Sequence, residues 1–182
     1  MGEVGSISTE SESPDELYKA AIEQWGSPLE RLAAAYEADW EKRRDLSQEI
    51  HFRLWRSLHG YDHRCSLRTW TYRIAHHVAA SHVMREKRIF SNLVSLEGLE
   101  VPPDNDRGQI ALEQQLTLAK LSMLIRQLKP LDRQVIVCWL EGIDAESTAE
   151  ITGLSPANVS VRVSRIKKLL AHRFHQGGGN AS

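Results

Sequence analysis

The sequence has very little cysteine and no long apolar segment. Only two cysteines occur in 182 residues, Cys65 and Cys138, and they stand far apart with no CxxC pair. This pattern excludes a disulfide framework and is typical of reduced thiols in a cytosolic protein. No apolar run approaches the length that crosses a bilayer, and the N-terminus is acidic without the apolar segment of a signal peptide. We therefore expect a soluble, cytoplasmic chain without membrane insertion.

Motifs for catalysis are also lacking. There is no glycine-rich phosphate loop, and the serines stand in no recognisable nucleophile context. Eight histidines invite a metal hypothesis, in which His63, Cys65, His76 and His77 approach one another. Loop histidines beside arginine and adjacent helix histidines are usually solvated, and no carboxylate-rich segment accompanies them. The sequence therefore predicts no enzyme, no metal site and no other cofactor.

Helical periodicity runs along most of the chain, and no segment alternates as a strand does. The pattern predicts an all-α fold of two small helical bundles joined by a flexible linker, the second bundle containing a helix-turn-helix. The predicted order is a disordered N-terminus over 1–14, a bundle over 15–90, an acidic linker over 91–109, a bundle over 110–175 and a disordered tail over 176–182.

In the first bundle, two helix breaks are expected. Gly26 and Pro28 are expected to end the first helix, with Ser27 capping the next one. A polar, basic stretch over 41–44 is expected to precede a helix over 45–58. The predicted apolar stripe of that helix comprises Leu46, Ile50, Leu54 and Leu58, widened by Phe52 and Trp55.

The stretch 144–170 is typical of a helix-turn-helix. Gly153 stands where one helix must end, and Ser155 with Pro156 is a typical helix start. One stripe of the second helix is apolar: Val159, Val163, Ile166 and Leu170. Its other faces are cationic, since no acid occurs from Pro156 to the chain end. Such a helix suits a DNA major groove, although the pattern alone also fits a solvated surface helix.

Basic charge is concentrated in two places. Segment 64–90 holds six bases and one acid, and segment 117–182 holds nine bases and five acids. Between them, segment 89–116 holds one base and five acids. This distribution indicates two separate cationic surfaces, a footprint that nucleic-acid binding requires.

Two segments resemble bacterial RNA polymerase sigma factors. Residues 45–49 and 52–55, followed by Trp70 and 72–75, resemble the conserved part of sigma domain 2, and 128–170 resembles domain 4. Two independent motifs in the right order on a short linker resemble the extracytoplasmic-function class of the sigma-70 family. The resemblance implies an alternative sigma factor that binds core RNA polymerase and directs initiation at promoters with −35 and −10 elements.

The resemblance also implies which residues contact which partner. The helix over 45–58 docks on the β′ coiled coil of the polymerase in this family, and the candidates here are Asp45, Gln48, Glu49, Arg53 and Trp55. The following loop and helix read and melt the −10 element, and the candidates are Tyr61, His63, Arg64, Trp70, Arg73, His76, His77, Ser81, Arg85, Lys87 and Arg88. Cationic grooves with aromatic surfaces suit unstacked single strands.

Domain 4 binds the −35 element as duplex in this family. The candidates are Ser155, Asn158, Ser160, Arg162, Ser164, Arg165, Lys167 and Lys168. Further implied partners are the β flap of the polymerase and an anti-sigma factor, with the protein in the cytoplasm and at the nucleoid when in holoenzyme.

Three departures from the family pattern affect these expectations. Residues 42–44 are Lys-Arg-Arg where the family usually has an acidic turn, which predicts weaker or altered polymerase docking. His77 stands where asparagine is frequent, which predicts a different base preference at the −10 element. Ser160 stands where lysine is common, which removes one expected phosphate contact.

Two alternatives fit the same composition. A helix-turn-helix regulator would bind DNA without initiating transcription, and a sigma-like decoy would bind polymerase or an anti-sigma factor without initiating. The pattern formed by Trp55, Trp70 and 72–75 favours a sigma factor, because a regulator does not need it.

Overall fold

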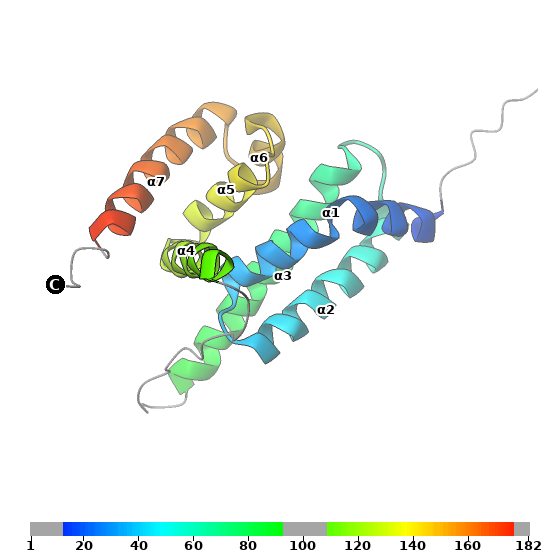
Figure 1. Ribbon diagram of the computed structural model, residues 1–182. Coiled ribbons are helices and arrows are strands. Elements are labelled where there is room, and N and C mark those ends of the chain that lie inside the picture. The colour runs from blue at the N-terminus through cyan, green and yellow to red at the C-terminus, as the bar shows by residue number, and fades with distance from the viewer. Residues whose placement is uncertain (1–12, 93–108, 177–182) are drawn as a thin grey trace, which may run out of the picture.

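The computed structural model describes residues 13–92 and 109–176, with side chains placed over 13–86 and 116–175. In this part of the chain every regular element is helical, as the sequence predicted. The first bundle comprises α1 (Pro14–Tyr36), α2 (Trp40–Ser57), a 3-10 turn (Leu58–Gly60) and α3 (Leu67–Asn92). The second comprises α4 (Gln109–Arg126), α5 (Pro130–Leu140), α6 (Ala145–Thr152) and α7 (Pro156–Gln176) (Figure 1).

Three predicted segments fall largely outside this description: the N-terminus over 1–14, the linker over 91–109 and the tail over 176–182. The helices reach slightly into two of them, since α1 begins at Pro14 and α3 ends at Asn92. Ser13 caps α1 through a capping box with Glu16, in which each side chain hydrogen-bonds the backbone N–H of the other.

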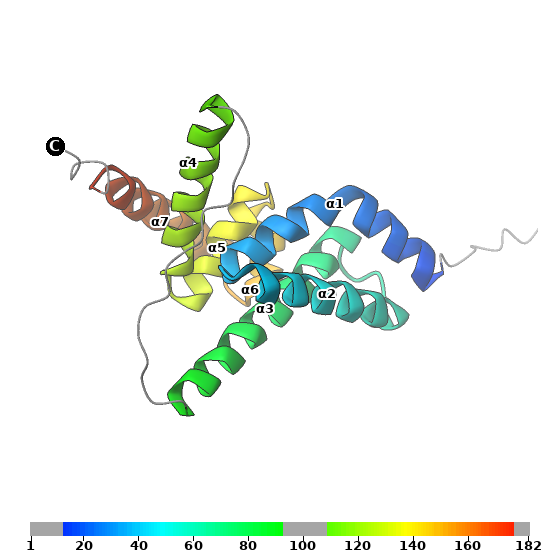
Figure 2. The ribbon, with the colours of Figure 1, turned by 60° about the horizontal axis from the view of Figure 1, so that its bottom comes forward.

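Helix α1 is continuous, so the predicted break at Gly26 and Pro28 is wrong. A proline inside a helix removes one backbone hydrogen bond and bends the axis, and Figure 2 shows α1 bending in its middle. The apolar face nevertheless continues across the proline, with Ala21 and Leu29 both fully buried. Burial against α2 and α3 offsets the local cost, which sequence propensity alone does not reveal.

Helix α2 begins earlier than predicted, and residues 41–44 are its first turn. The reason is a cap that the prediction missed, because Asp39 Oδ1 accepts from Lys42 N at 2.9 Å. The stripe of Leu46, Ile50, Leu54 and Leu58 is buried as predicted. Phe52 and Trp55 do not widen it, since they are 50% and 39% exposed.

The predicted helix-turn-helix is formed by α6 and α7. Gly153 ends α6 with φ 75°, and Ser155 Oγ accepts from Asn158 N at 3.3 Å at the start of α7. Val159, Ile166 and Leu170 are buried and Val163 is half-buried, which confirms the predicted stripe. The two helices pack on each other and on α5.

Replacing Gly153 with alanine should lower the free energy of unfolding by about 1 kcal/mol, because an L side chain is disfavoured at positive φ. A Cβ there would meet nothing within 4 Å, so the cost is confined to the backbone. Urea unfolding of the full chain measures it. Gly60→Ala is the matched control: its Cβ also meets nothing within 4 Å, and we expect its unfolding midpoint to stay near that of the wild type. Equal loss in both variants would contradict the prediction.

The two bundles pack against each other rather than standing apart. Helices α1 and α3 contact α4, α5 and α6 (Figures 1 and 2). Arg31 of α1 donates to both carboxylate oxygens of Glu141, at 2.9 Å from Nε and 2.6 Å from Nη2. Arg68 of α3 donates to the carbonyl oxygen of Glu141 at 2.5 Å. Two helices of the first bundle therefore hydrogen-bond to the turn after α5.

Candidate nucleic-acid interface

The five candidate polymerase contacts on α2 all reach solvent. Asp45, Gln48 and Arg53 are exposed, and Glu49 is half-buried. Arg53 Nε donates to Glu49 Oε1 at 2.6 Å, one turn away. Trp55 donates from Nε1 to Asp15 Oδ1 at 2.8 Å, so the start of α1 holds its ring. Together with exposed Phe52, these side chains give α2 a mixed polar and aromatic outer face.

The basic residues at the start of α2 are partly engaged within the fold. Lys42 forms an ion pair with Glu86 of α3, and this pairing raises the pKa of Lys42. The guanidinium of Arg43 lies over the Trp40 ring, 5.3 Å from its centroid. Arg44 is exposed. Of the three, Arg44 therefore presents its charge most directly to a partner.

An aromatic cluster forms around the loop over 61–66. The Tyr61 ring centroid lies 4.3 Å from that of His63 and 5.3 Å from that of Trp70. Tyr61 donates from its hydroxyl to the Cys65 carbonyl at 2.7 Å, and Trp70 donates from Nε1 to Ser57 Oγ at 3.0 Å. His63 adopts a left-handed backbone with φ 57°, which turns the loop. We call Tyr61, His63 and Trp70 the aromatic wall.

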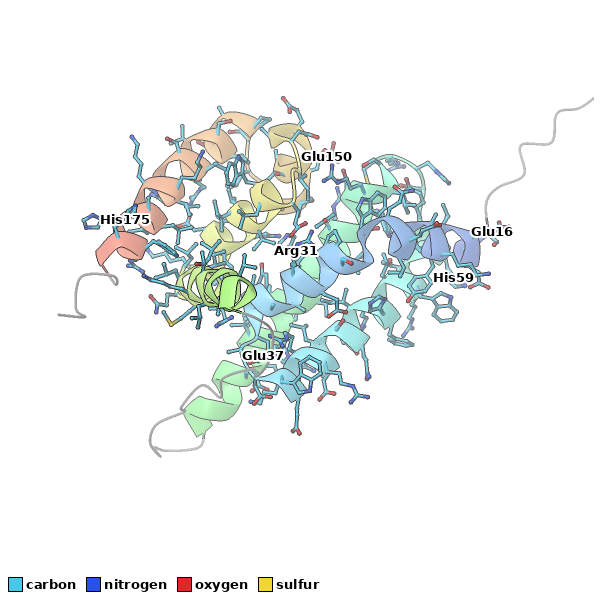
Figure 3. The ribbon with its side chains drawn as sticks, viewed as in Figure 1. Glu16, Arg31, Glu37, His59, Glu150 and His175 are labelled. Carbon is cyan, nitrogen blue, oxygen red and sulfur yellow. The ribbon has the colours of Figure 1, made fainter. Side chains whose placement is uncertain are left out.

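The other −10 candidates divide into accessible and inaccessible residues. Arg64, His77, Ser81 and Arg85 are exposed. Arg73 is half-buried, and its guanidinium lies 3.6 Å from the carboxylate of Glu150. Figure 3 labels Glu150 on α6. The side chains of Lys87 and Arg88 lie outside the described residues. Helix α6 of the second bundle therefore rests beside the −10 candidate helix α3.

His76 does not belong to the exposed surface, and its placement there by the sequence is wrong. The ring is fully buried, with Tyr36 Oη 3.0 Å from Nδ1 and Cys138 Sγ 3.2 Å from Nε2. Burial lowers the pKa of His76 to about 3. The contact with Cys138 comes from α5, so the face of α3 that looked free from its periodicity is covered by the second bundle. In the described ranges no three histidine, cysteine or acidic side chains gather as metal ligands.

The −35 candidates lie on α7, apart from Ser155, which directly precedes it. Ser155, Asn158, Ser160, Ser164, Lys167 and Lys168 are exposed. Ser160 donates from its hydroxyl to the Pro156 carbonyl at 3.1 Å, and Lys167 Nζ lies 4.5 Å from the centroid of the Trp139 ring. Ser164 and Lys168 help line a groove of about 450 Å³ that Trp139 and Ile143 also border.

Two further −35 candidates share one carboxylate, which the sequence reasoning missed. Arg162 Nη1 donates to Asp132 Oδ1 at 2.6 Å, and Arg165 Nη2 lies 3.2 Å from each oxygen of the same group. Asp132 is in the first turn of α5 and is buried. No local pattern in the sequence points to this pairing, because the partners stand at least thirty residues apart and meet only in the folded chain.

These features describe an all-α protein with a helix-turn-helix and two cationic surfaces. A family model for sigma-70 region 2 matches residues 21–89, and one for sigma-70 region 4 matches residues 118–170. Together they cover about two thirds of the chain. The chain belongs to the sigma-70 family of RNA polymerase sigma factors, as the sequence predicted. It is a sigma factor for promoter recognition.

Solved structures of other proteins share this fold, among them two complexes. The structure of CnrH in complex with the cytosolic domain of CnrY matches with a TM-score of 0.63 and 19% identity, covering 87% of this chain and 88% of that one. The sigma factor RpoE in complex with the anti-sigma factor NepR from Bartonella quintana matches with 0.65 and 20%, covering 85% and 94%. No curated protein sequence matched significantly. No helix among the described residues is long and apolar enough to span a membrane.

Proposed function

We propose that residues 15–90 dock on core polymerase and open the −10 element, and that residues 110–175 bind the −35 element as duplex. The observation that carries the proposal is the aromatic wall with exposed Arg64 in the same loop, followed by exposed Arg85 further along α3. The protein then works in the cytoplasm, at the nucleoid when in holoenzyme, as a DNA-binding initiation factor with no chemistry of its own.

The −10 assignment is supported by the physics of single strands. A base that leaves the duplex loses its stacking energy. Stacking on an aromatic ring restores about 1–3 kcal/mol of that energy, whichever base it is. Tyr61 and Trp70 are half-buried and fixed by hydrogen bonds, so their rings are held in place before a base arrives. Arg64, beside them in the loop, and Arg85, further along α3, supply charge for the phosphates.

The −35 assignment is supported by the exposed face of α7. Asn158, Ser160 and Ser164 offer hydrogen-bonding groups near its start, and Lys167 and Lys168 follow with positive charge. Two weakly binding modules on one chain act as a bidentate ligand for a promoter with the right spacing.

The α2 face with Asp45, Gln48 and Arg53 is assigned to the β′ coiled coil, and the second bundle to the β flap. An anti-sigma factor is a further proposed partner, since both similar structures are complexes: CnrH with the cytosolic domain of CnrY, and RpoE with the anti-sigma factor NepR. Exposed apolar side chains on both bundles, such as Trp40 and Leu118, give such a protein surface to cover.

The test is transcription in vitro with reconstituted holoenzyme and genomic DNA, followed by mapping of transcript 5′ ends. A sigma factor gives start sites that share upstream elements. A regulator gives no transcript without another sigma factor. A decoy binds core polymerase but gives no transcript, and either result would overturn the proposal.

Replacing Arg44 with glutamate should raise the affinity for core polymerase by about 1.4- to 5-fold, because an exposed charge contact contributes roughly 0.2–1 kcal/mol. Arg44 is chosen because Lys42 and Arg43 have partners within the fold. Titration of labelled protein with core polymerase measures the effect. Lys19→Glu, an equal charge reversal at an exposed site on α1, is the control. An affinity for Arg44→Glu equal to wild type would rule out the basic turn as a brake on docking.

A further inference from the structure

Asp132 is an acid that pairs with two arginines of the proposed DNA-binding helix. Its negative charge would, on a simple charge argument, disfavour DNA binding. It lies in the first turn of α5, where the helix dipole favours a carboxylate. Its side chain is 13% exposed, and both arginines that it binds come from α7. A buried carboxylate with two cationic partners is a built site rather than a chance surface contact.

The shared carboxylate fixes the conformations of both arginines. Arg162 and Arg165 are three residues apart on one helix, so without an acid between them their like charges would push the side chains apart. Each arginine also has about 2 kcal/mol of rotamer entropy that is lost on ordering. Here that ordering occurs before DNA arrives, which lowers the entropic cost of a later phosphate contact.

Both guanidiniums keep groups for another partner. Each contacts Asp132 through one terminal nitrogen, Nη1 in Arg162 and Nη2 in Arg165. A guanidinium has five N–H donors in a planar fork, so the other nitrogens remain for an oxyanion. The side chains are 31% and 64% exposed, and solvent therefore reaches them while they are held.

We propose that Asp132 is a positioning residue that holds Arg162 and Arg165 as a paired clamp for a backbone phosphate of the −35 element. This inference rests on the proposed function of α7. Charge alone predicts that removing this acid would tighten DNA binding. The positioning role predicts the opposite, that its removal weakens DNA binding.

The experiment measures affinity of full-length holoenzyme for promoter duplex with an intact or a scrambled −35 element, at several salt concentrations. In Asp132→Asn, we expect the affinity for both duplexes to fall about 3- to 30-fold, because a phosphate contact does not depend on sequence, and the log–log salt slope to fall by about one per lost phosphate contact. Glu146→Gln removes the same charge from exposed α6 and should leave affinity unchanged or slightly tighter.

Three comparisons decide the outcome. In an Arg162→Ala, Arg165→Ala background, Asp132→Asn should cause no further loss, because the residue acts through those arginines. An equal loss in that background, or tighter binding in the single variant, overturns the proposal. If the double arginine variant itself binds the intact element as well as wild type, the −35 assignment fails instead.

A second variant covers the case in which Asp132→Asn does not fold. Asp132→Glu keeps the net charge but moves the carboxylate outward by one methylene, so it should displace both guanidiniums and weaken binding by a few-fold. Thermal melting of each variant shows whether the protein is folded at the assay temperature. Unchanged affinity in Asp132→Glu, together with failure of Asp132→Asn to fold, overturns the positioning role.

Discussion

Replacing Tyr61 with alanine should reduce start-site-specific transcription by about 10- to 100-fold, the equivalent of losing one base–aromatic stacking contact. The ring stands between His63 and Trp70 in the aromatic wall, so its removal leaves no continuous surface for an unstacked base. The measurement is open-complex formation by holoenzyme at a promoter found by transcript mapping, followed with a fluorescent base at the −10 element.

Tyr61→Phe is the matched control. It keeps the ring and removes only the hydroxyl that donates to the Cys65 carbonyl. We expect it to retain most activity, and duplex binding at the −35 element should be the same in both variants. If Tyr61→Phe lost as much activity as Tyr61→Ala, the tyrosine would hold the loop rather than bind a base.

Acidification from pH 7 to pH 5 should destabilise the protein by about 2 kcal/mol through His76 alone. The ring is buried and neutral, with its pKa lowered to about 3 from the ordinary 6.5. The unfolded chain therefore binds a proton that the folded chain does not. The stabilisation is complete above pH 6.5 and is lost as the pH falls toward 3.

None of the side chains that contact the His76 ring is an acid that could stabilise its protonated form. It faces Tyr36 of α1, Tyr72 of α3 and Cys138 of α5, and burial raises the pKa of all three, to about 12 for Tyr72 and Cys138. These groups stay neutral across the window, so a protonated imidazole gains no compensating charge.

Urea unfolding at pH 5 and pH 7 measures the prediction, and His76→Gln is the comparison. Glutamine has no proton to bind in this range, so its stability should change between the two pH values by about 2 kcal/mol less than that of wild type. Parallel pH dependence in both proteins would show that other groups cause the loss.

Hydrophobic periodicity and composition were sufficient to predict much of the fold and the positions of part of the candidate site. The helix-turn-helix followed from Gly153, Ser155 and one apolar stripe, since helix ends and amphipathic faces are local properties. The loop over 61–66 and the exposed candidates on α2 were also found where sequence placed them. Propensity failed at Gly26 and Pro28, where long-range burial outweighs a local break.

The sequence by itself determined that the chain is helical, carries two cationic surfaces and belongs to a sigma-factor family, because these depend on residue order and spacing. Only the tertiary structure decided which cations face outward. Lys42 pairs with Glu86, Arg162 and Arg165 share Asp132, and His76 lies beneath Cys138. Each partner stands at least thirty residues away in the sequence. Helical periodicity therefore predicts which face of its helix a residue occupies, but only the tertiary fold determines which side chains cover that face.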